Sequence, residues 1–205
     1  HTLAWWQAFR RFGHDVPMAT IHRTIGMGGR RLTAHLLGQD RDADEDQLLE
    51  DTHTAVFSTY WPALRPLDGA PDLVRHCAEA GLTAVLAPSA RQEELEILRG
   101  VVNADDWLTA ATSSADAERS KPAPDILAAA LQAGGLQAAD CVFVGDAVWD
   151  ILAAAELGIP TIGLTCGGTA EAELRDAGAV EVYAGPRELL ESFGASRLGR
   201  LAGSC

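Results

Sequence analysis

Long apolar runs are absent from this sequence of 205 residues. No stretch approaches the roughly 18 to 20 continuous apolar residues of a membrane span, and no basic segment followed by an apolar run opens the chain. The chain also lacks a stripe dense in lysine or arginine, and its net charge is −13. An excess of negative charge repels nucleic-acid backbones and anionic membrane surfaces, so we expect a cytoplasmic protein that binds neither.

A C-x-x-C pair is also missing, which argues against a zinc or dithiol redox site. The four cysteines are far apart in the sequence and have aliphatic neighbours or lie at the terminus, as buried thiols of a reducing compartment do: Cys77, Cys141, Cys166 and Cys205. Cys166 has no histidine nearby in the sequence, so a thiol nucleophile is not expected. The length suits one core of ordinary size plus a small satellite domain.

Strand-like segments are absent from the first third of the chain. Leu3, Trp6 and Phe9 fall on one helical stripe, and later leucines repeat the same spacing. The glycines of residues 26–31 interrupt this pattern, and Arg30 and Arg31 follow them at once. We therefore predict a small all-helical domain over residues 1–65, with a flexible, cationic turn between two of its helices.

A Pro/Gly turn at residues 66–71 marks a change of regime and the predicted domain boundary. After it, short apolar runs alternate with amphipathic helical patterns, which predicts an α/β fold with a doubly wound, mainly parallel sheet over residues 66–205. The predicted strands are 83–87, 110–112, 141–144, 161–164 and 180–183, and the predicted helices are 73–80, 92–102, 124–133, 148–157, 170–177 and 186–192. Ligands bind such sheets at the carboxyl ends of the strands.

The strongest local signal is the segment 142–150, an apolar strand that ends in glycine and Asp146, with Asp150 four residues later. At a strand end the first carboxylate points into the crevice, and the second lies in the first turn of the next helix. Two such carboxylates suit Mg²⁺, which takes one or two of them together with water and substrate phosphate. The alternative is that Asp146 caps the helix and Asp150 complements its dipole.

A second signal is Lys121, which is followed by Pro-Ala-Pro-Asp. The two prolines stiffen the backbone ahead of a helix predicted to start near Pro124. A fixed ammonium beside carboxylates and phosphate would neutralise their mutual repulsion. Taken singly, a lysine ahead of such a turn is more often a solvated surface residue.

Together, the S-K-P-A-P-D and G-D-A-V-W-D segments resemble the lysine and acidic metal motifs of the haloacid dehalogenase superfamily, in its phosphoglycolate phosphatase-like branch with a helical cap domain. The resemblance implies a Mg²⁺-dependent phosphatase of the Rossmann-like fold. It implies that Asp146 is a direct metal ligand, that Asp150 is a direct or indirect one, and that Lys121 stabilises the phosphate. Gly26 and Arg30 would then lie in the cap loop that meets the substrate, a small phosphorylated metabolite.

Two departures from the family pattern follow. Pro88 stands where the family has a phosphate-gripping Thr or Ser, and Ser89, one residue later, either takes that role or is only a turn residue. The family's nucleophile lies in a D-x-D motif after a first strand, whereas the D-x-D pattern at residues 42–46 follows helical sequence and is interpreted as a solvated acidic turn. In the family this first strand lies between the strands ending near Ala87 and Val144, so we expect two open sheet edges there.

The expected function is therefore hydrolysis of a small phosphate monoester through an aspartyl-phosphate, with the nucleophile-bearing segment missing from this chain and the chain as given inactive. We expect upstream residues that carry the D-x-D motif. An inactive protein of this fold that binds phosphate and metal, or regulates, is the alternative. A receiver-type signalling module is disfavoured because such modules lack the helical domain.

Overall fold

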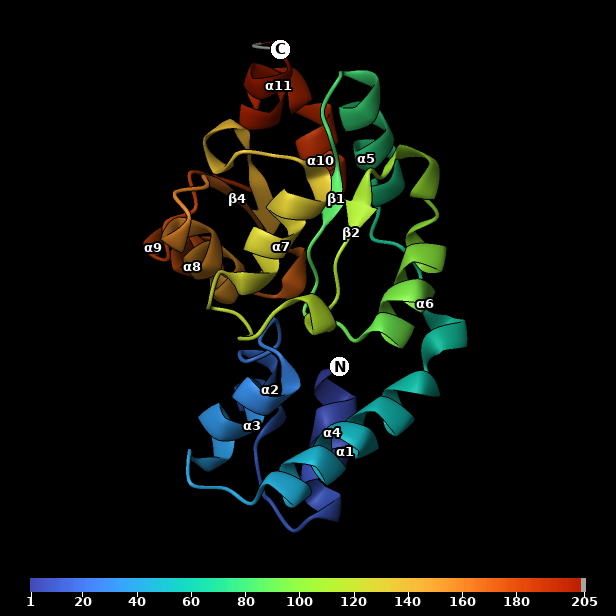
Figure 1. Ribbon diagram of the computed structural model, residues 1–205, viewed down its shortest axis with the longest axis vertical. Helices are drawn as coiled ribbons and strands as arrows, with labels where there is room; N and C mark the ends of the chain where they lie inside the picture. Colours follow the sequence, from blue (N-terminus) through green and yellow to red (C-terminus); the bar gives the residue numbers. More distant parts are fainter. Residues whose placement is uncertain (204–205) are drawn as a thin grey trace. The chain divides into compact units, whose positions relative to one another are not determined.

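The computed structural model describes residues 1–203, and the fourth cysteine, Cys205, lies outside them. The chain divides into two compact units, His1–Leu64 and Arg65–Cys205, which Figure 1 colours blue to teal and teal to red. Among the described residues, no helix combines the length and the apolar character that crossing a membrane requires.

The first unit is helical throughout. Its elements are α1 (Thr2–Arg11), α2 (Met18–His22), α3 (Gly29–Leu37), α4 (Ala43–Ser58) and the 3₁₀ helix η1 (Trp61–Ala63). The core lies between α1 and α4, where Phe9 and Leu49 are fully buried and the rings of Trp5 and His53 stack with centroids 4.4 Å apart. The spacing of these apolar residues matches the helical period, which explains why they share one face.

The acidic run at the start of α4 is only partly the solvated turn that the sequence predicts. Asp42 is the N-cap of α4, and its carboxylate accepts hydrogen bonds from the backbone N–H of Asp44 at 2.8 Å and of Glu45 at 3.2 Å. Asp46 is half-buried and pairs with Arg41 at 2.6 Å. An N-cap carboxylate satisfies helix N–H groups that lack partners, so this D-x-D run has a structural use.

The turn in the glycine-rich segment, residues 24–31, is shorter than the sequence predicts. Ile25 and Met27 form an isolated bridge, and α3 already begins at Gly29. Arg30 and Arg31 therefore lie in the first turn of α3 and not in the flexible turn predicted from the sequence.

The second unit alternates helices and strands, as predicted. Its strands are β1 (Val85–Leu86), β2 (Ala110–Ala111), β3 (Phe143–Gly145), β4 (Thr161–Leu164) and β5 (Glu181–Tyr183). Its α-helices are α5 (Ala70–Glu79), α6 (Gln92–Val102), α7 (Asp125–Gly134), α8 (Val148–Glu156), α9 (Glu171–Asp176), α10 (Pro186–Glu191) and α11 (Arg197–Ala202). Short 3₁₀ helices occupy Asp105–Trp107, Ser114–Asp116, Ala138–Asp140, Thr165–Gly167 (η5) and Phe193–Ala195. The predicted α/β class is confirmed, and the sequence patterns missed α11.

All strand pairs are parallel, but they form two sheets. β1 pairs with β2, and a separate sheet has the order β3-β4-β5. Within the described residues, β1 and β3 are edge strands of different sheets, with no strand between them. This is the arrangement of open edges expected from the sequence.

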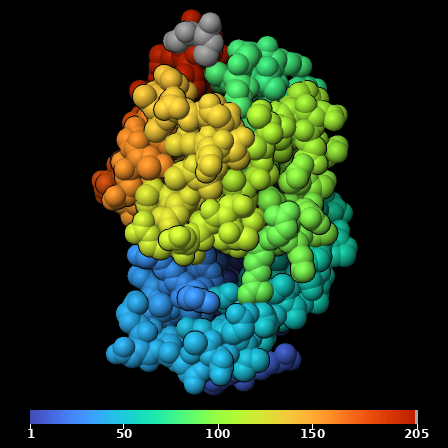
Figure 2. Space-filling view, viewed as in Figure 1, coloured from blue at the N-terminus to red at the C-terminus, as the bar shows by residue number. Residues whose placement is uncertain are grey.

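Alternate residues of the larger sheet pack on opposite helical layers. Val144, Ile162 and Tyr183 belong to a core with residues of α5, α10 and α11. Phe143 packs with residues of α7 and α8, and Val182 with residues of α8 and α9. Because successive strand side chains point to opposite faces, this division places helices on both sides of the sheet. Figure 2 gives a space-filling view from the same direction, in which atoms coloured from green to red form the visible surface of the second unit.

A pH effect on stability follows from Cys77, which lies on α5 and packs against the core shared with β4. Burial raises the pKa of its thiol from 9.0 to about 11. Between these two values the unfolded chain loses the proton while the folded chain keeps it, so stability is lost as pH rises through this window. We expect urea midpoints of the natural protein to fall more steeply from pH 9 to pH 11 than those of Cys77→Ala, and parallel slopes would contradict this.

Candidate active site

The site forms where the carboxyl ends of β1 and β3 are followed by loops. Ala87 comes directly after β1, and Asp146 directly after β3. Lys121 lies in the loop before α7, and Asp150 lies in the first turn of α8. The fold thus brings residues from three segments of the chain together at the carboxyl ends of the strands, which is where open parallel sheets bind ligands.

The ammonium group of Lys121 is buried, with 4% of the residue exposed. Its Nζ donates to the backbone carbonyl of Ala87 at 2.9 Å and to Oδ1 of Asp150 at 2.8 Å, and it lies 5.4 Å from the ring centroid of Phe143. An ammonium has three donors, and burial of a charge is tolerated when it is paired and hydrogen-bonded. Lys121 is therefore not the solvated surface residue of the alternative interpretation.

Both carboxylate oxygens of Asp150 have partners. Oδ1 accepts from Lys121, and Oδ2 accepts from the backbone N–H of Asp146 at 3.3 Å and of Ala147 at 3.2 Å. Gly145 makes this approach possible, because a Cβ there would lie 2.5 Å from Cβ of Asp150. These contacts favour an indirect role for Asp150, in which it holds Lys121 and the Asp146 backbone in place.

The surroundings of Asp146 come from the loop after β4. The Cα of Gly167 lies against the Asp146 carboxylate, since a Cβ on Gly167 would come within 2.3 Å of Oδ2. The hydroxyl of Thr169 donates to the backbone carbonyl of Asp146 at 2.9 Å. Cys166 is exposed and not the buried thiol expected from the sequence. Partial desolvation, and then the nearby charge of Asp146, raise the pKa of its thiol, which disfavours the nucleophilic thiolate.

Mg²⁺ is the metal that this donor set suits. The described residues contain no group of three or more His, Cys, Asp or Glu side chains placed to hold a metal. Mg²⁺ does not need one, because it keeps several waters and uses one or two carboxylates with substrate phosphate. Asp146, which directly follows β3, is the carboxylate of this site that would hold the ion.

Comparison with other proteins shows to which family this chain belongs. The haloacid dehalogenase-like hydrolase family matches residues 1–158, more than half of the chain. The chain belongs to the haloacid dehalogenase-like hydrolase family. The resemblance to this superfamily, which the sequence indicated, is thereby confirmed.

Three proteins similar to this chain differ widely in the share of their own length that the chain matches. Protein CbbY of Cupriavidus necator is 34% identical over 102 residues, which are 48% of this chain and 39% of that protein. SUPPRESSOR OF QUENCHING 1, a chloroplastic protein of Arabidopsis thaliana, is 34% identical over 80% of this chain and 15% of its own length. The chain thus spans less than half the length of both. Validoxylamine A 7'-phosphate phosphatase of Streptomyces hygroscopicus is 24% identical over 82% of this chain and 79% of that protein.

Solved structures agree with the haloacid dehalogenase-like fold. A hydrolase from Pseudomonas syringae has a TM-score of 0.90 at 28% identity, with 95% of this chain and 90% of that chain covered. A putative β-phosphoglucomutase from Bacteroides vulgatus has a TM-score of 0.82 at 19% identity, with 98% and 83% covered, and at that identity it supports the fold alone.

Ser89, Gly26 and Arg30 are the other site residues predicted from the sequence. Ser89 lies in the loop after β1, two residues beyond the Ala87 carbonyl that Lys121 contacts. Gly26, with φ of 105°, and Arg30 belong to the first unit. The substrate-facing role that the haloacid dehalogenase-like family implies for these three residues stays a prediction.

Sequence reasoning missed two features of this haloacid dehalogenase-like site. Lys121 is the only lysine in the chain, and the other residues among its 16 lysines and arginines are all arginine. A single lysine among arginines could have indicated a specific role. The contacts of Gly167 and Thr169 with Asp146 had no such signal, because the loop follows Asp146 by about twenty residues of ordinary helix and strand pattern.

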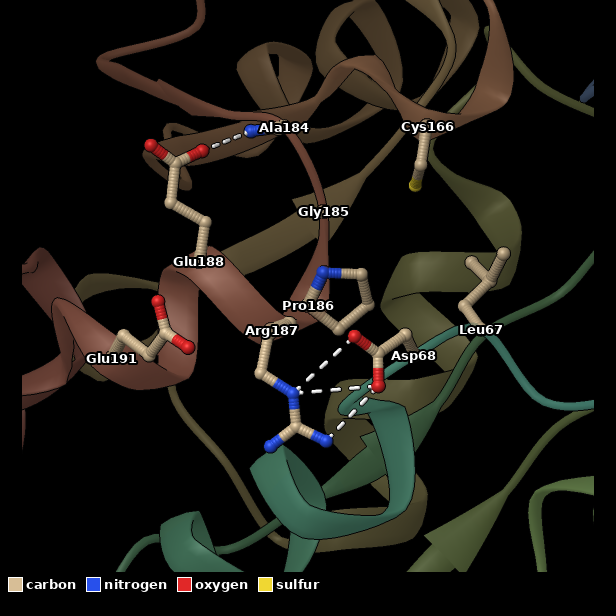
Figure 3. A pocket seen from close by; sticks show the side chains of 9 residues that line it. All are labelled: Leu67, Asp68, Cys166, Ala184, Gly185, Pro186, Arg187, Glu188 and Glu191. Atoms are coloured by element: carbon tan, nitrogen blue, oxygen red, sulfur yellow. Dashed lines mark hydrogen bonds and ion pairs between the residues drawn. The ribbon is translucent and has the colours of Figure 1, made fainter.

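A cavity of about 380 Å³ lies beyond Cys166, at the ends of β4 and β5. Figure 3 shows Arg187 of α10 extended toward Asp68, and the two groups are 3.0 Å apart. Arg187 also pairs with Asp72 at 3.3 Å, and its hydrogen bonds hold the pKa of Asp68 below its ordinary value. The guanidinium of Arg187 thus links α10 to α5, and its ion pairs within the protein give it a structural role.

Proposed function

We propose that this protein hydrolyses small phosphate monoesters with the help of Mg²⁺ and through an aspartyl-phosphate. The observation that carries the proposal is the buried ammonium of Lys121, paired with Asp150 at the strand ends next to Asp146. A positive group fixed inside a site rich in carboxylate is suited to a polyanionic substrate. Membership of a hydrolase family supports the same reaction class.

Lys121 would bind the phosphate through its third donor. Two of its N–H groups point to Ala87 and Asp150, and the remaining one would donate to a nonbridging phosphate oxygen. Because Asp150 and the Ala87 carbonyl fix the side chain, the ammonium needs little reorganisation as negative charge moves during the reaction. Ser89 would donate its hydroxyl to a second oxygen of the phosphate.

Asp146 would hold the metal. When bound, Mg²⁺ neutralises phosphate charge and aligns the phosphorus with the attacking oxygen. Asp150 would hold two neighbours in position, because its carboxylate accepts hydrogen bonds from the backbone N–H of Asp146 and from the ammonium of Lys121. Lys121 and the metal held by Asp146 would therefore both bind the same phosphate.

The attacking carboxylate would come from a segment outside residues 1–205. Among the described residues, the D-x-D run at 42–46 caps α4 and follows no strand, so it is not placed as a nucleophile. The free edges of β1 and β3 offer a place for one further strand, whose end would meet Asp146 and Lys121. Without it we expect residues 1–205 to be inactive.

The substrate would be a small phosphorylated metabolite of sugar or carboxylic acid type, met by Gly26 and Arg30 of the helical unit acting as a cap. Arg30 is exposed in the first turn of α3, where a guanidinium can pair with an anionic group on a substrate. The relative that dephosphorylates validoxylamine A 7'-phosphate, as its name states, supports a compact organic phosphate.

The test is hydrolysis of p-nitrophenyl phosphate with Mg²⁺ by residues 1–205 and by a longer chain with a strand and D-x-D motif added before His1. We expect turnover only in the longer chain, at least about a thousandfold above the shorter one, because nucleophile and charge-stabilising residues act as a unit. A higher thermal midpoint of the longer chain would report that the added strand pairs.

A second candidate is a protein of the same fold that binds phosphate and metal without turnover, which the absence of a strand-borne D-x-D from the described residues favours. Mg²⁺ plus orthovanadate would then raise the thermal midpoint, while neither chain hydrolyses p-nitrophenyl phosphate. Absence of both protection and hydrolysis would remove both candidates.

A further inference from the structure

The loop between β4 and α9 is built around Asp146. It consists of η5, then Gly168 with a left-handed φ of 89°, then Thr169. Gly168 turns the backbone so that Gly167 and Thr169 both face the end of β3. The loop thereby contacts Asp146 at two points, one on the side chain and one on the main chain.

Gly167 closes one side of the Asp146 carboxylate. A Cβ on Gly167 would lie 2.3 Å from Oδ2, 2.6 Å from Cγ and 2.8 Å from Cβ of Asp146. Contacts this short do not occur between real atoms, so any side chain here would force the carboxylate to turn away or the loop to move. The missing side chain therefore permits the observed orientation of the carboxylate.

The main chain of Asp146 is held from both ends of the residue. Its N–H donates to Oδ2 of Asp150, and its carbonyl accepts from the half-buried hydroxyl of Thr169. A residue whose backbone N–H and carbonyl are both hydrogen-bonded has little freedom in φ and ψ. The Thr169 hydroxyl is the part of this arrangement that a single substitution can remove without changing the side chain's shape.

We propose that Gly167 and Thr169 are positioning residues that orient Asp146 and so set the affinity of the site for its divalent cation. This inference rests on the proposed function for the identity of Asp146 as the metal ligand. Groups that orient a ligating side chain without touching the metal commonly change metal affinity by about 10- to 100-fold. A loop that only connected β4 to α9 would have no such effect.

The test uses residues 1–205 and Mn²⁺ alone, with the free ion measured by electron paramagnetic resonance. We expect Thr169→Val to weaken Mn²⁺ binding about tenfold or more, and Thr169→Ser, which keeps the hydroxyl, to bind nearly as the natural chain does. Gly167→Ala should weaken binding at least as much. Urea unfolding of each variant measures any loss of stability separately, and if Gly167→Ala does not fold, the Thr169 pair decides.

Asp146→Asn separates this inference from the proposed function. If Asp146→Asn abolishes Mn²⁺ binding while Thr169→Val leaves it unchanged, the positioning role is wrong and the metal assignment stands. If Asp146→Asn leaves Mn²⁺ binding unchanged, or the natural chain binds no Mn²⁺, the metal assignment and the positioning role both fail. Equal weakening by Thr169→Val and Thr169→Ser would also overturn the role of the hydroxyl.

Discussion

Asp150→Ala is expected to destabilise the second unit by about 3–5 kcal/mol, the cost of leaving one partner of a buried ion pair without the other. The ammonium of Lys121 would keep only the Ala87 carbonyl, and the backbone N–H groups of Asp146 and Ala147 would lose their acceptor. Urea unfolding, followed by circular dichroism, measures the change as a lower midpoint with an unchanged slope.

Lys121→Met supplies the matched control, because methionine resembles the lysine stem without its charge. Asp150 would then keep its two backbone donors, so we expect a smaller loss, about 1.5–3 kcal/mol. The double variant should be more stable than Asp150→Ala alone, since it leaves no buried charge without a partner. A double variant whose loss equals the sum of the two single losses would show that the pair is not coupled.

The order of helices and strands could be predicted because it depends on local periodicity. The predicted helix 92–102 has the bounds found for α6, since its apolar spacing begins and ends with the helix. α11 was missed because it has only six residues in a segment rich in glycine and serine. It is held by Ser196, whose hydroxyl caps it, and by Leu198, which packs on the sheet core. Such tertiary support is not written in a local pattern.

The candidate site divides along the same line. That Asp146, Asp150 and Lys121 lie near one another could be predicted, because strand ends of a parallel sheet share one edge. The partners of the Asp150 carboxylate could not be predicted, because spacing does not show that it turns back toward the backbone N–H groups and Lys121. The short turn at residues 26–29 was likewise hidden, since a glycine at a helix start and one within a loop look alike in sequence.

Asp146→Asn is expected to reduce Mg²⁺-dependent hydrolysis of p-nitrophenyl phosphate by more than about a hundredfold in the chain that carries the added D-x-D strand, because the amide removes the negative charge at the metal. Folding should change little, since asparagine keeps the size of the side chain and the backbone contacts with Asp150 and Thr169 remain. Initial rates at increasing Mg²⁺ concentration measure the effect, and a partial rescue at high Mg²⁺ would identify weakened metal binding as its cause.

Asp44→Asn is the matched control for this substitution. Asp44 is exposed, follows the N-cap Asp42 and belongs to the other acidic run of the chain, so the same change of charge should leave hydrolysis unaltered. The comparison separates a local role at the end of β3 from a general effect of lowering the net negative charge. If both variants lost activity alike, the assignment of Asp146 as the metal ligand would be wrong. If only Asp44→Asn lost activity, the acidic run at the start of α4 would take part in the reaction, and its assignment as a helix cap alone would be wrong.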